Sequence, residues 1–399
     1  MKKLFISLVA LVAVLASCSK SQMIELPGNE QEISFNPYFG KTTLTKGAVV
    51  DQAAFEQLTE KDGGAFQVMA FMHTTEVGLG DDNKTYDFDA ARINTDADAM
   101  YMNEAVWHEN EGWKYDGVTY WPDPATKRYL TFCAYAKNTP MYSDDTEYGI
   151  DFGDETTEYT YHVSEKVEEH YDLIAAPIQP NLLSNSTTLL NGKVNFTFNH
   201  LLSKVGFKVV SNTDNDKIEI NIKSLKISGD FYGSGKVDLK SNTAEIIPVV
   251  NDTHDEYVLL SNELGYFSAV ASTTATDIYV NNGSLVNGKI ESGIGAKDVN
   301  NSYLMLIPCP SKDVKIEVVY HLTNAKEDQT ATVILPETFG EGESAIKGFV
   351  AGKQYTFVLS ISTTAIDFSA TVSGWDNAFV TQTFKLEQTV EESEEGEEN

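Results

Sequence analysis

Hydrophobic and polar residues alternate along much of the chain, which is the pattern of β-strands with one buried face. One face of "VKIEVVY" carries Val314, Ile316, Val318 and Tyr320, and one face of "KQYTFVLSIS" carries Tyr355, Phe357, Leu359 and Ile361. In "KIEINIKSLKI" the apolar positions change parity at Lys223-Ser224. That change predicts a bulge or bend within the strand.

Turn signals such as "SGD" (228–230) and "GEG" (340–342) separate these short strands. Many short strands with polar turns predict an all-β chain built from sandwiches or barrels. The stretch "QPNLLSNSTTLLNG" (179–192) reads as a connector. We therefore expect an N-terminal β-sandwich over 27–185 and a C-terminal β-sandwich over 186–378.

The first residues have the pattern of an export signal. Two lysines precede an apolar run, Leu4 to Ala16, which is too short to cross ~30 Å of hydrocarbon. The following Leu-Ala-Ser-Cys resembles a bacterial lipobox, in which the cysteine is acylated after cleavage. This predicts a signal peptide over 1–17, a lipid on Cys18 and a linker over 18–26. An ordinary secretory signal with a coincidental cysteine is the alternative.

Charge narrows the choice of partners. The formal net charge of −30 repels phosphate backbones and argues against nucleic acid as a partner. The last nine residues, "EESEEGEEN", carry six glutamates and read as a solvated tail. Cys133 and Cys309 lie in strand-like contexts, and we favour two separate buried thiols over a disulfide.

The sequence contains no recognisable active site. "GDFYGSGKV" (229–237) lacks the spacing of a phosphate loop and has Val237 where a metal-binding hydroxyl would stand, so a turn is favoured. "NTDNDK" (212–217) lacks the glycine and distal glutamate of an EF-hand, so a hairpin loop is favoured. Neither HExxH nor G-x-S-x-G occurs. We predict no enzyme activity, no metal and no cofactor.

Aromatic residues crowd into positions 107–135, including Trp107, Trp113, Tyr115 and Trp121. Such side chains can stack on sugars, so a glycan-binding surface is one interpretation. They can equally pack a core beside the tight corner at "YWPDP". Core packing is the preferred interpretation.

Several segments, taken in order, resemble the fimbrillin family of Bacteroidales, the pilins of type V pili. The most specific are "VNFTFNHLLSKVGFKVV" (194–210), "SYLMLIPCP" (302–310), "GKQYTFVLSI" (352–361) and "VSGW" (372–375). The resemblance covers most of the mature chain. It implies two tandem transthyretin-like β-sandwich domains, export as a lipoprotein and assembly into surface fimbriae.

In that family a protease removes the first strand, and an extended strand from the next subunit fills the groove. The first-strand candidate here is "QEISFNP", with Ile33 and Phe35 on one face. The corresponding cleavage position is Lys46-Gly47, where the family would have an Arg-Ala pair. If no cut occurs there, the subunit stays tethered by its lipid.

The candidate donor strand is "FVTQTFKLEQTV" (379–390), followed by the acidic tail to 399. Its apolar residues Val380, Phe384, Leu386 and Val390 share one face. The alternative is that these residues form the last strand of their own domain.

The resulting hypothesis is a structural subunit of fimbriae at the outer membrane surface. Its expected partners are other fimbrial subunits, joined by strand exchange, the outer membrane through the lipid, and a host or bacterial surface ligand. The competing hypothesis is a surface glycan-binding lipoprotein that uses the aromatics between Trp107 and Trp121.

Overall fold

The computed structural model describes residues 31–39, 65–87, 100–110, 112–136, 147–153, 157–213, 218–260, 267–270, 276–278, 303–363, 365–374 and 382–386. These residues form β-strands and one-turn 3₁₀ helices at Pro124–Thr126, Val167–Glu169 and Gly342–Ser344, and none of them is in an α-helix. The all-β prediction is therefore confirmed. No helix in the described part of the chain is long and apolar enough to span a bilayer.

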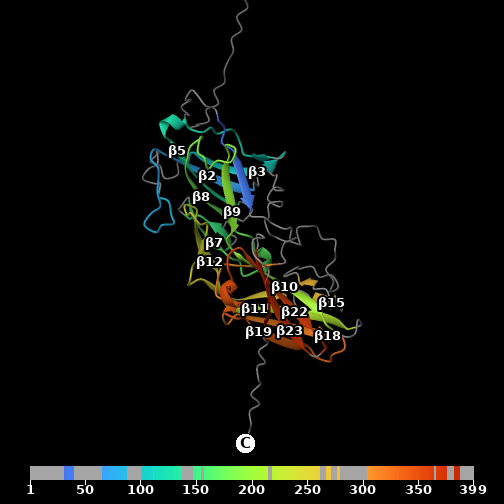
Figure 1. Ribbon diagram of the computed structural model, residues 1–399. Helices are drawn as coiled ribbons and strands as arrows, with labels where there is room; N and C mark the ends of the chain where they lie inside the picture. The colour runs from blue at the N-terminus through green and yellow to red at the C-terminus, as the bar shows by residue number, and fades with distance from the viewer. Residues whose placement is uncertain are drawn as a thin grey trace, which may run out of the picture.

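Two sheets form the half of the molecule drawn uppermost in Figure 1. The larger has seven strands in the order β1 (Phe35–Phe39), β9 (Val194–His200), β8 (Ile174–Leu182), β5 (Tyr129–Ala136), β2 (Phe66–His73), β3 (Met102–Glu109) and β4 (Gly112–Lys114). The smaller has four, in the order β13 (Ile246–Pro248), β12 (Ser234–Asp238), β7 (Glu158–His162) and β6 (Gly149–Asp151).

Two further sheets form the lower half of Figure 1. One has the order β16 (Thr276–Ile278), β10 (Ser203–Ser211), β22 (Lys353–Ile361), β23 (Ile366–Gly374) and β24 (Gln382–Leu386), with β17 (Leu304–Leu306) also on β10. The other has the order β14 (Thr253–Leu260), β11 (Glu219–Tyr232), β18 (Lys315–Leu322) and β19 (Gln329–Ile334), with β15 (Phe267–Val270) on β11. A short hairpin pairs β20 (Thr338–Phe339) with β21 (Ile346–Lys347).

The alternating positions occupy the core as predicted. In β22 the four aligned residues Tyr355, Phe357, Leu359 and Ile361 are fully buried, while their neighbours are half-buried. In β11 the pairing with β18 shifts register between Ile222 and Ser224, at the predicted bulge. The prediction from alternation succeeded because the apolar side chains are buried only while the strand keeps its pairing register.

Three turn expectations have different outcomes. "GEG" lies between β20 and β21, with Gly340 and Gly342 at positive φ. The expected turn at "SGD" is wrong, because β11 runs through it with only a register shift beside β14. The loop after β10 is no hairpin, because β10 and β11 belong to different sheets. Alternation and turn residues alone do not distinguish a bulge from a turn.

The four sheets enclose two hydrophobic clusters. One fills a single face of the seven-stranded sheet and contains Phe66, Phe132, Phe196 and Phe198. The other is continuous through both halves of the molecule, from Met69 and Phe71 to Phe357 and Val372. The seven-stranded sheet is thus buried on both faces over its central strands.

The sheets do not divide at residue 186. β9, β12 and β13 follow that position in sequence, but β9 pairs with β8 and β12 pairs with β7. The expected connector at 179–192 therefore includes the end of β8 and a turn that leads back into the same sheet.

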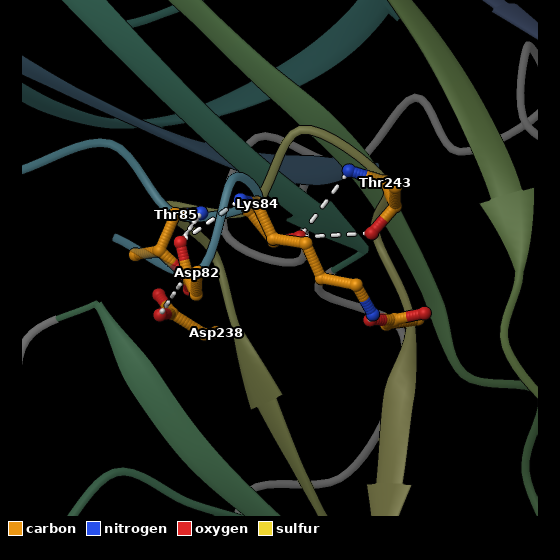
Figure 2. A network of polar contacts seen from close by, with 7 residues as sticks. Asp82, Lys84, Thr85, Asp238 and Thr243 are labelled. Carbon is orange, nitrogen blue, oxygen red and sulfur yellow. Dashed lines mark hydrogen bonds and ion pairs between the residues drawn. The ribbon is translucent and has the colours of Figure 1, made fainter. Parts of the chain in front are cut away.

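The β12–β13 hairpin is also fastened to the loop after β2 (Figure 2). Asp82 accepts hydrogen bonds from the backbone N–H groups of Lys84 and Thr85, and these bonds lower the pKa of its carboxyl to about 2. Lys84 pairs with Glu245, and the N–H of Asn242 donates to the carbonyl of Lys84. Side chains and backbone therefore hold this hairpin against the first half of the sequence.

The crossing from β9 to β10 contains buried polar groups. Nδ1 of His200 lies 2.8 Å from Oδ2 of Asp172, and both side chains are buried. Nζ of Lys204 lies 3.8 Å from the ring centre of Tyr303. His200 ends β9 in the seven-stranded sheet, and Lys204 lies in β10 of the sheet that contains β22. The contacts therefore lie where the chain crosses from one sheet to the other.

Candidate functional site: the first and last strands

The first described strand forms one edge of the seven-stranded sheet. β1 runs parallel to β9, with Phe35 opposite Val194 and Pro37 opposite Phe196. Parallel neighbours are rarely joined by a short turn, because the chain must cross back over the sheet. Here 154 residues separate β1 from β9 in the printed sequence (194 minus 40), so the strand pairs through non-local contacts.

Both residues predicted to face the groove are in the core. Ile33 is 0% exposed and Phe35 is 1% exposed. The ring of Phe35 stacks on Phe196 at 6.0 Å and meets Phe66 and Phe132 edge-on, each at 6.3 Å. An aromatic side chain packed this fully contributes several kcal/mol to the attachment of the strand, about 3–5 by the cost of truncating such residues.

The other face of the strand is polar. Asn36 donates from its amide to the Asn195 side chain at 2.9 Å, and both are half-buried. Tyr38 is exposed. The strand is therefore amphipathic in the way that its sequence predicts.

A second element holds the strand from its other edge. The N–H of Ile33 donates to the carbonyl of Thr119 at 2.8 Å, and the N–H of Trp121 donates to the carbonyl of Gln31 at 2.9 Å. Glu32 and Tyr120 form the antiparallel bridge between these two bonds. We call residues 115–121 the clasp.

Tyr115 completes the clasp. Its hydroxyl donates to the carbonyl of Ile33 at 2.9 Å and accepts the N–H of Thr119 at 3.1 Å. Burial raises the pKa of the phenol above its ordinary value, so the hydroxyl keeps its proton and remains a donor. Its ring also meets Phe35 at 5.7 Å.

The clasp draws on the aromatic run that the sequence singled out. Trp121 is 4% exposed and packs edge-on against Phe132 at 5.7 Å. Trp113 is half-buried against Phe66. Core packing therefore accounts for Trp121, and a buried indole has no face for a sugar. Sequence reasoning missed the pairing of this run with the first strand, because no local pattern in "VTY" distinguishes a strand-binding edge from a loop.

The last described strand forms an edge of the third sheet. β24 runs antiparallel to β23, with Leu386 opposite Phe368 and Phe384 opposite Ala370. Leu386 is buried. In the single chain these residues occupy their own sheet, and β23 is their one neighbour among the described strands.

The other predicted positions lie outside the described residues. These are Cys18, Lys46, Gly47, Val380 and Val390. Cys133 and Cys309 are both buried, and burial raises the pKa of the Cys309 thiol to about 12. Within the described ranges no group of three or more His, Cys, Asp or Glu side chains could hold a metal ion.

Comparison with known proteins identifies the family. The model of the fimbrillin-like family matches residues 61–375. A search of curated protein sequences gave no match.

Among solved structures, a fimbrial protein from Bacteroides vulgatus is 16% identical, with a TM-score of 0.46 over 86% of this chain and 99% of that one. A fimbrial assembly protein from Parabacteroides distasonis is 12% identical, with a TM-score of 0.36 over 89% and 100% of the two chains. A tip fimbrial protein from Porphyromonas gingivalis is 7% identical, with a TM-score of 0.37 over 78% and 95%. These scores are too low to carry the assignment, which rests on the family match. Because that match covers residues 61–375 of 399, the chain belongs to the fimbrillin-like family.

Proposed function

We propose that this protein is a structural subunit of bacterial surface fimbriae, exported as a lipoprotein and joined to other subunits by β-strand donation. Family membership supports the fimbrial role. The observation that carries the strand-exchange mechanism is the attachment of residues 31–39. They lie at a sheet edge, bury Ile33 and Phe35, and are held by β9 on one side and by the clasp on the other.

Processing at Lys46-Gly47 would make this strand exchangeable. The position falls in sequence between β1, which ends at Phe39, and β2, which begins at Phe66. A cut there leaves residues 31–39 attached by non-covalent contacts alone. Their loss would uncover Val194, Phe196 and Phe198 on β9 and Phe66 on β2. A strand from another subunit would restore that burial.

The C-terminal segment is the candidate donor. The first and third sheets lie at opposite ends of the molecule in Figure 1, so one subunit can receive a strand at one end and offer a strand at the other. Such head-to-tail contacts are heterologous and generate filaments when they do not close into a ring. Four apolar side chains would contribute about 6–12 kcal/mol before ordering costs.

A lipid on Cys18 would carry the subunit to the outer membrane. The N-terminal residue of the native protein distinguishes two forms of the subunit. Acylated Cys18 identifies a tethered subunit, whereas a chain that starts at Gly47 identifies a processed one. We propose a structural role without catalysis, in contact with other subunits and with a ligand at the host or bacterial surface.

The test is assembly of the purified protein. Full-length protein cut at Lys46-Gly47 should form ladders that survive mild denaturant, and the same protein ending at residue 378 should not. Cut protein that stays monomeric with an intact C-terminus would contradict strand donation. Mass spectrometry of the N-terminus, measured on protein from the native membrane, tests the lipid separately.

A further inference from the structure

We propose that Tyr148 and Tyr171 form a binding site for neutral saccharides on the surface beside the four-stranded sheet. The inference rests on the proposed function, which includes a ligand at the host or bacterial surface, and it names the chemical class of that ligand. The site uses neither Trp113 nor Trp121.

The rings of the two tyrosines are parallel. Their centroids lie 6.5 Å apart and their planes differ by 5°. Tyr171 is 40% exposed and Tyr148 is half-buried, so both rings keep aromatic surface in contact with water. The C–H bonds of a pyranose ring form an apolar face that packs against such rings, and tyrosine supplies this contact area at a low cost in conformational entropy.

The backbone that carries both rings is fixed by the fold. His170 and Asp172, on either side of Tyr171, are 4% and 3% exposed. The hydroxyl of Tyr161 donates to the backbone carbonyl of Tyr171 at 3.0 Å. Tyr148 directly precedes β6, whose first residue is buried. The rings are therefore held close to their binding positions, and less ordering is needed when a ligand binds.

A polar group of balanced charge lies beside the pair of rings. Glu169, at the end of a 3₁₀ helix, accepts hydrogen bonds from Nζ of Lys166 at 3.1 Å and from the Ser164 hydroxyl at 2.6 Å. Partial burial opposes ionisation of Glu169, but these two bonds lower the pKa of its carboxyl below the ordinary value. The carboxylate and the ammonium therefore offer an acceptor and a donor to sugar hydroxyls.

The phenol of Tyr148 adds a further donor. Burial raises the pKa of this phenol above its ordinary value, and the charge of Glu169 raises it further. The Tyr148 hydroxyl therefore keeps its proton at neutral pH. Because the charge of Glu169 acts on Tyr148, the polar group and the ring belong to one site.

The charges favour a neutral ligand over a charged one. Lys166 is paired with Glu169, so a cationic ligand would have to compete with the ammonium for that carboxylate. An anionic ligand is opposed by the formal net charge of −30. A neutral saccharide meets neither obstacle.

The exposure of Tyr171 predicts weak binding to a single subunit. An open surface buries less of a ligand than a pocket does, and we expect a Kd on the order of 1 mM. Subunits repeated along a fimbria would present many copies of the site, and simultaneous binding would raise the overall affinity.

Saturation-transfer difference NMR on the uncut full chain tests the proposal. The probes are cellohexaose, maltohexaose, xylohexaose and mannohexaose, each titrated to about 5 mM. At least one should bind. Tyr148→Ala and Tyr171→Ala should each lower its affinity about tenfold or more, because an aromatic face is lost. The Phe variants at both positions keep the ring and should lose less than the Ala variants.

Tyr120→Ala is the matched control, because this ring is 42% exposed. It should leave the affinity unchanged within about twofold. Thermal unfolding should be similar for Tyr171→Ala and the unsubstituted protein, since Tyr161 binds the backbone carbonyl of Tyr171, which the substitution leaves in place. Equal losses of affinity in Tyr120→Ala and Tyr171→Ala would overturn the site.

Two further outcomes would overturn the proposal. In one, none of the four neutral probes binds. In the other, hexagalacturonate or tetramethylammonium binds more tightly than every neutral probe, which would make the ligand class wrong. The result is independent of strand donation, which is measured on cut protein: lost sugar binding with intact ladders refutes this site alone, and absent ladders with intact sugar binding refute strand donation alone.

Discussion

The backbone N–H of Met305 donates a hydrogen bond to Nδ1 of His170 over 3.1 Å, although 135 residues separate them in sequence. Because that N–H can only donate, Nδ1 accepts, and Nε2 carries the proton that His170 donates to the carbonyl of Ser164 at 2.7 Å. The ring of Tyr257 meets the imidazole edge-on at 5.2 Å. A neutral, buried histidine therefore joins the two halves of the molecule.

Acid should weaken this joint. Burial lowers the pKa of His170 to about 4 from the ordinary 6.5. Below about pH 6.5 the imidazole of the unfolded chain binds a proton, whereas that of the folded chain stays neutral until about pH 4. The contribution of neutral His170 to the free energy of unfolding is therefore complete above about pH 6.5 and is lost as the pH falls to about 4. Between pH 7 and 4.5 we expect this residue alone to reduce the free energy of unfolding by roughly 2 to 3 kcal/mol.

His170→Asn tests the assignment, because asparagine offers an acceptor to Met305 and does not titrate. In guanidinium unfolding at pH 7 and pH 4.5, the variant should lose less stability between the two pH values than the unsubstituted protein, by roughly 2 to 3 kcal/mol. An identical loss in both proteins would show that other groups cause the acid sensitivity.

Tyr115→Phe should loosen the first strand without disturbing the C-terminal half. The change removes a hydroxyl that bonds both Ile33 and Thr119, which costs about 1–2 kcal/mol. Amide exchange in residues 31–39 should accelerate about tenfold, while exchange in β11 and β18 stays unchanged. Tyr120→Phe, on an exposed ring in the same clasp, is the control. If both changes accelerated amide exchange in residues 31–39 equally, the Tyr115 hydroxyl would not hold the first strand.

Phe35→Ala should detach the strand more severely. Its ring contacts four other rings of the same cluster, and truncation of such a residue costs about 3–5 kcal/mol. Susceptibility of residues 31–39 to limited proteolysis reports the detachment. Tyr38→Ala, at 43% exposure on the opposite face, should change it little. Similar cleavage of both variants would contradict the amphipathic attachment.

Trp121→Ala separates the fimbrial hypothesis from the glycan-binding one. Trp121 lies in the core beside Phe132, so we expect a loss of about 3–5 kcal/mol in unfolding free energy. In affinity electrophoresis through polysaccharide gels, any retardation of the unsubstituted protein should be the same for the Trp121→Ala variant. A folded, fully stable variant that has lost binding to a polysaccharide would favour the glycan-binding alternative.

Fragments divided at residue 186 should not fold independently. The N-terminal fragment lacks β9, β12 and β13, and the C-terminal fragment exposes the apolar residues Val194, Phe196 and Phe198. Near-ultraviolet circular dichroism should show fixed tertiary packing only after the two fragments are mixed. Native-like spectra of each fragment alone would show two autonomous domains.

The amphipathic strands were predictable from sequence, because apolar residues at every second position mark the face of a strand that is buried. The faces of β18 and β22, the bulge after Ile222 and the inward positions of Ile33 and Phe35 all follow from where apolar residues recur. A one-residue slip would turn each of these faces outward, so the pattern leaves little freedom.

The choice of neighbours was not predictable in the same way. Backbone N–H and C=O groups are the same in every strand, so alternation does not specify which edge a strand joins. β12 pairs with β7 across 71 residues (234 minus 163), and the clasp pairs with residues 31–33 across the whole of β2 to β4. The expected division at 186 failed to follow the sheets for this reason.

The sequence by itself determined that the chain is all-β, which side chains face inward and which segment begins the first sheet. Only the tertiary structure decided that β1 lies parallel to β9, that the clasp holds its other edge, and that a hairpin late in the sequence completes the first half. Local patterning fixes the burial of each strand, whereas partner choice depends on the packing of all the strands together.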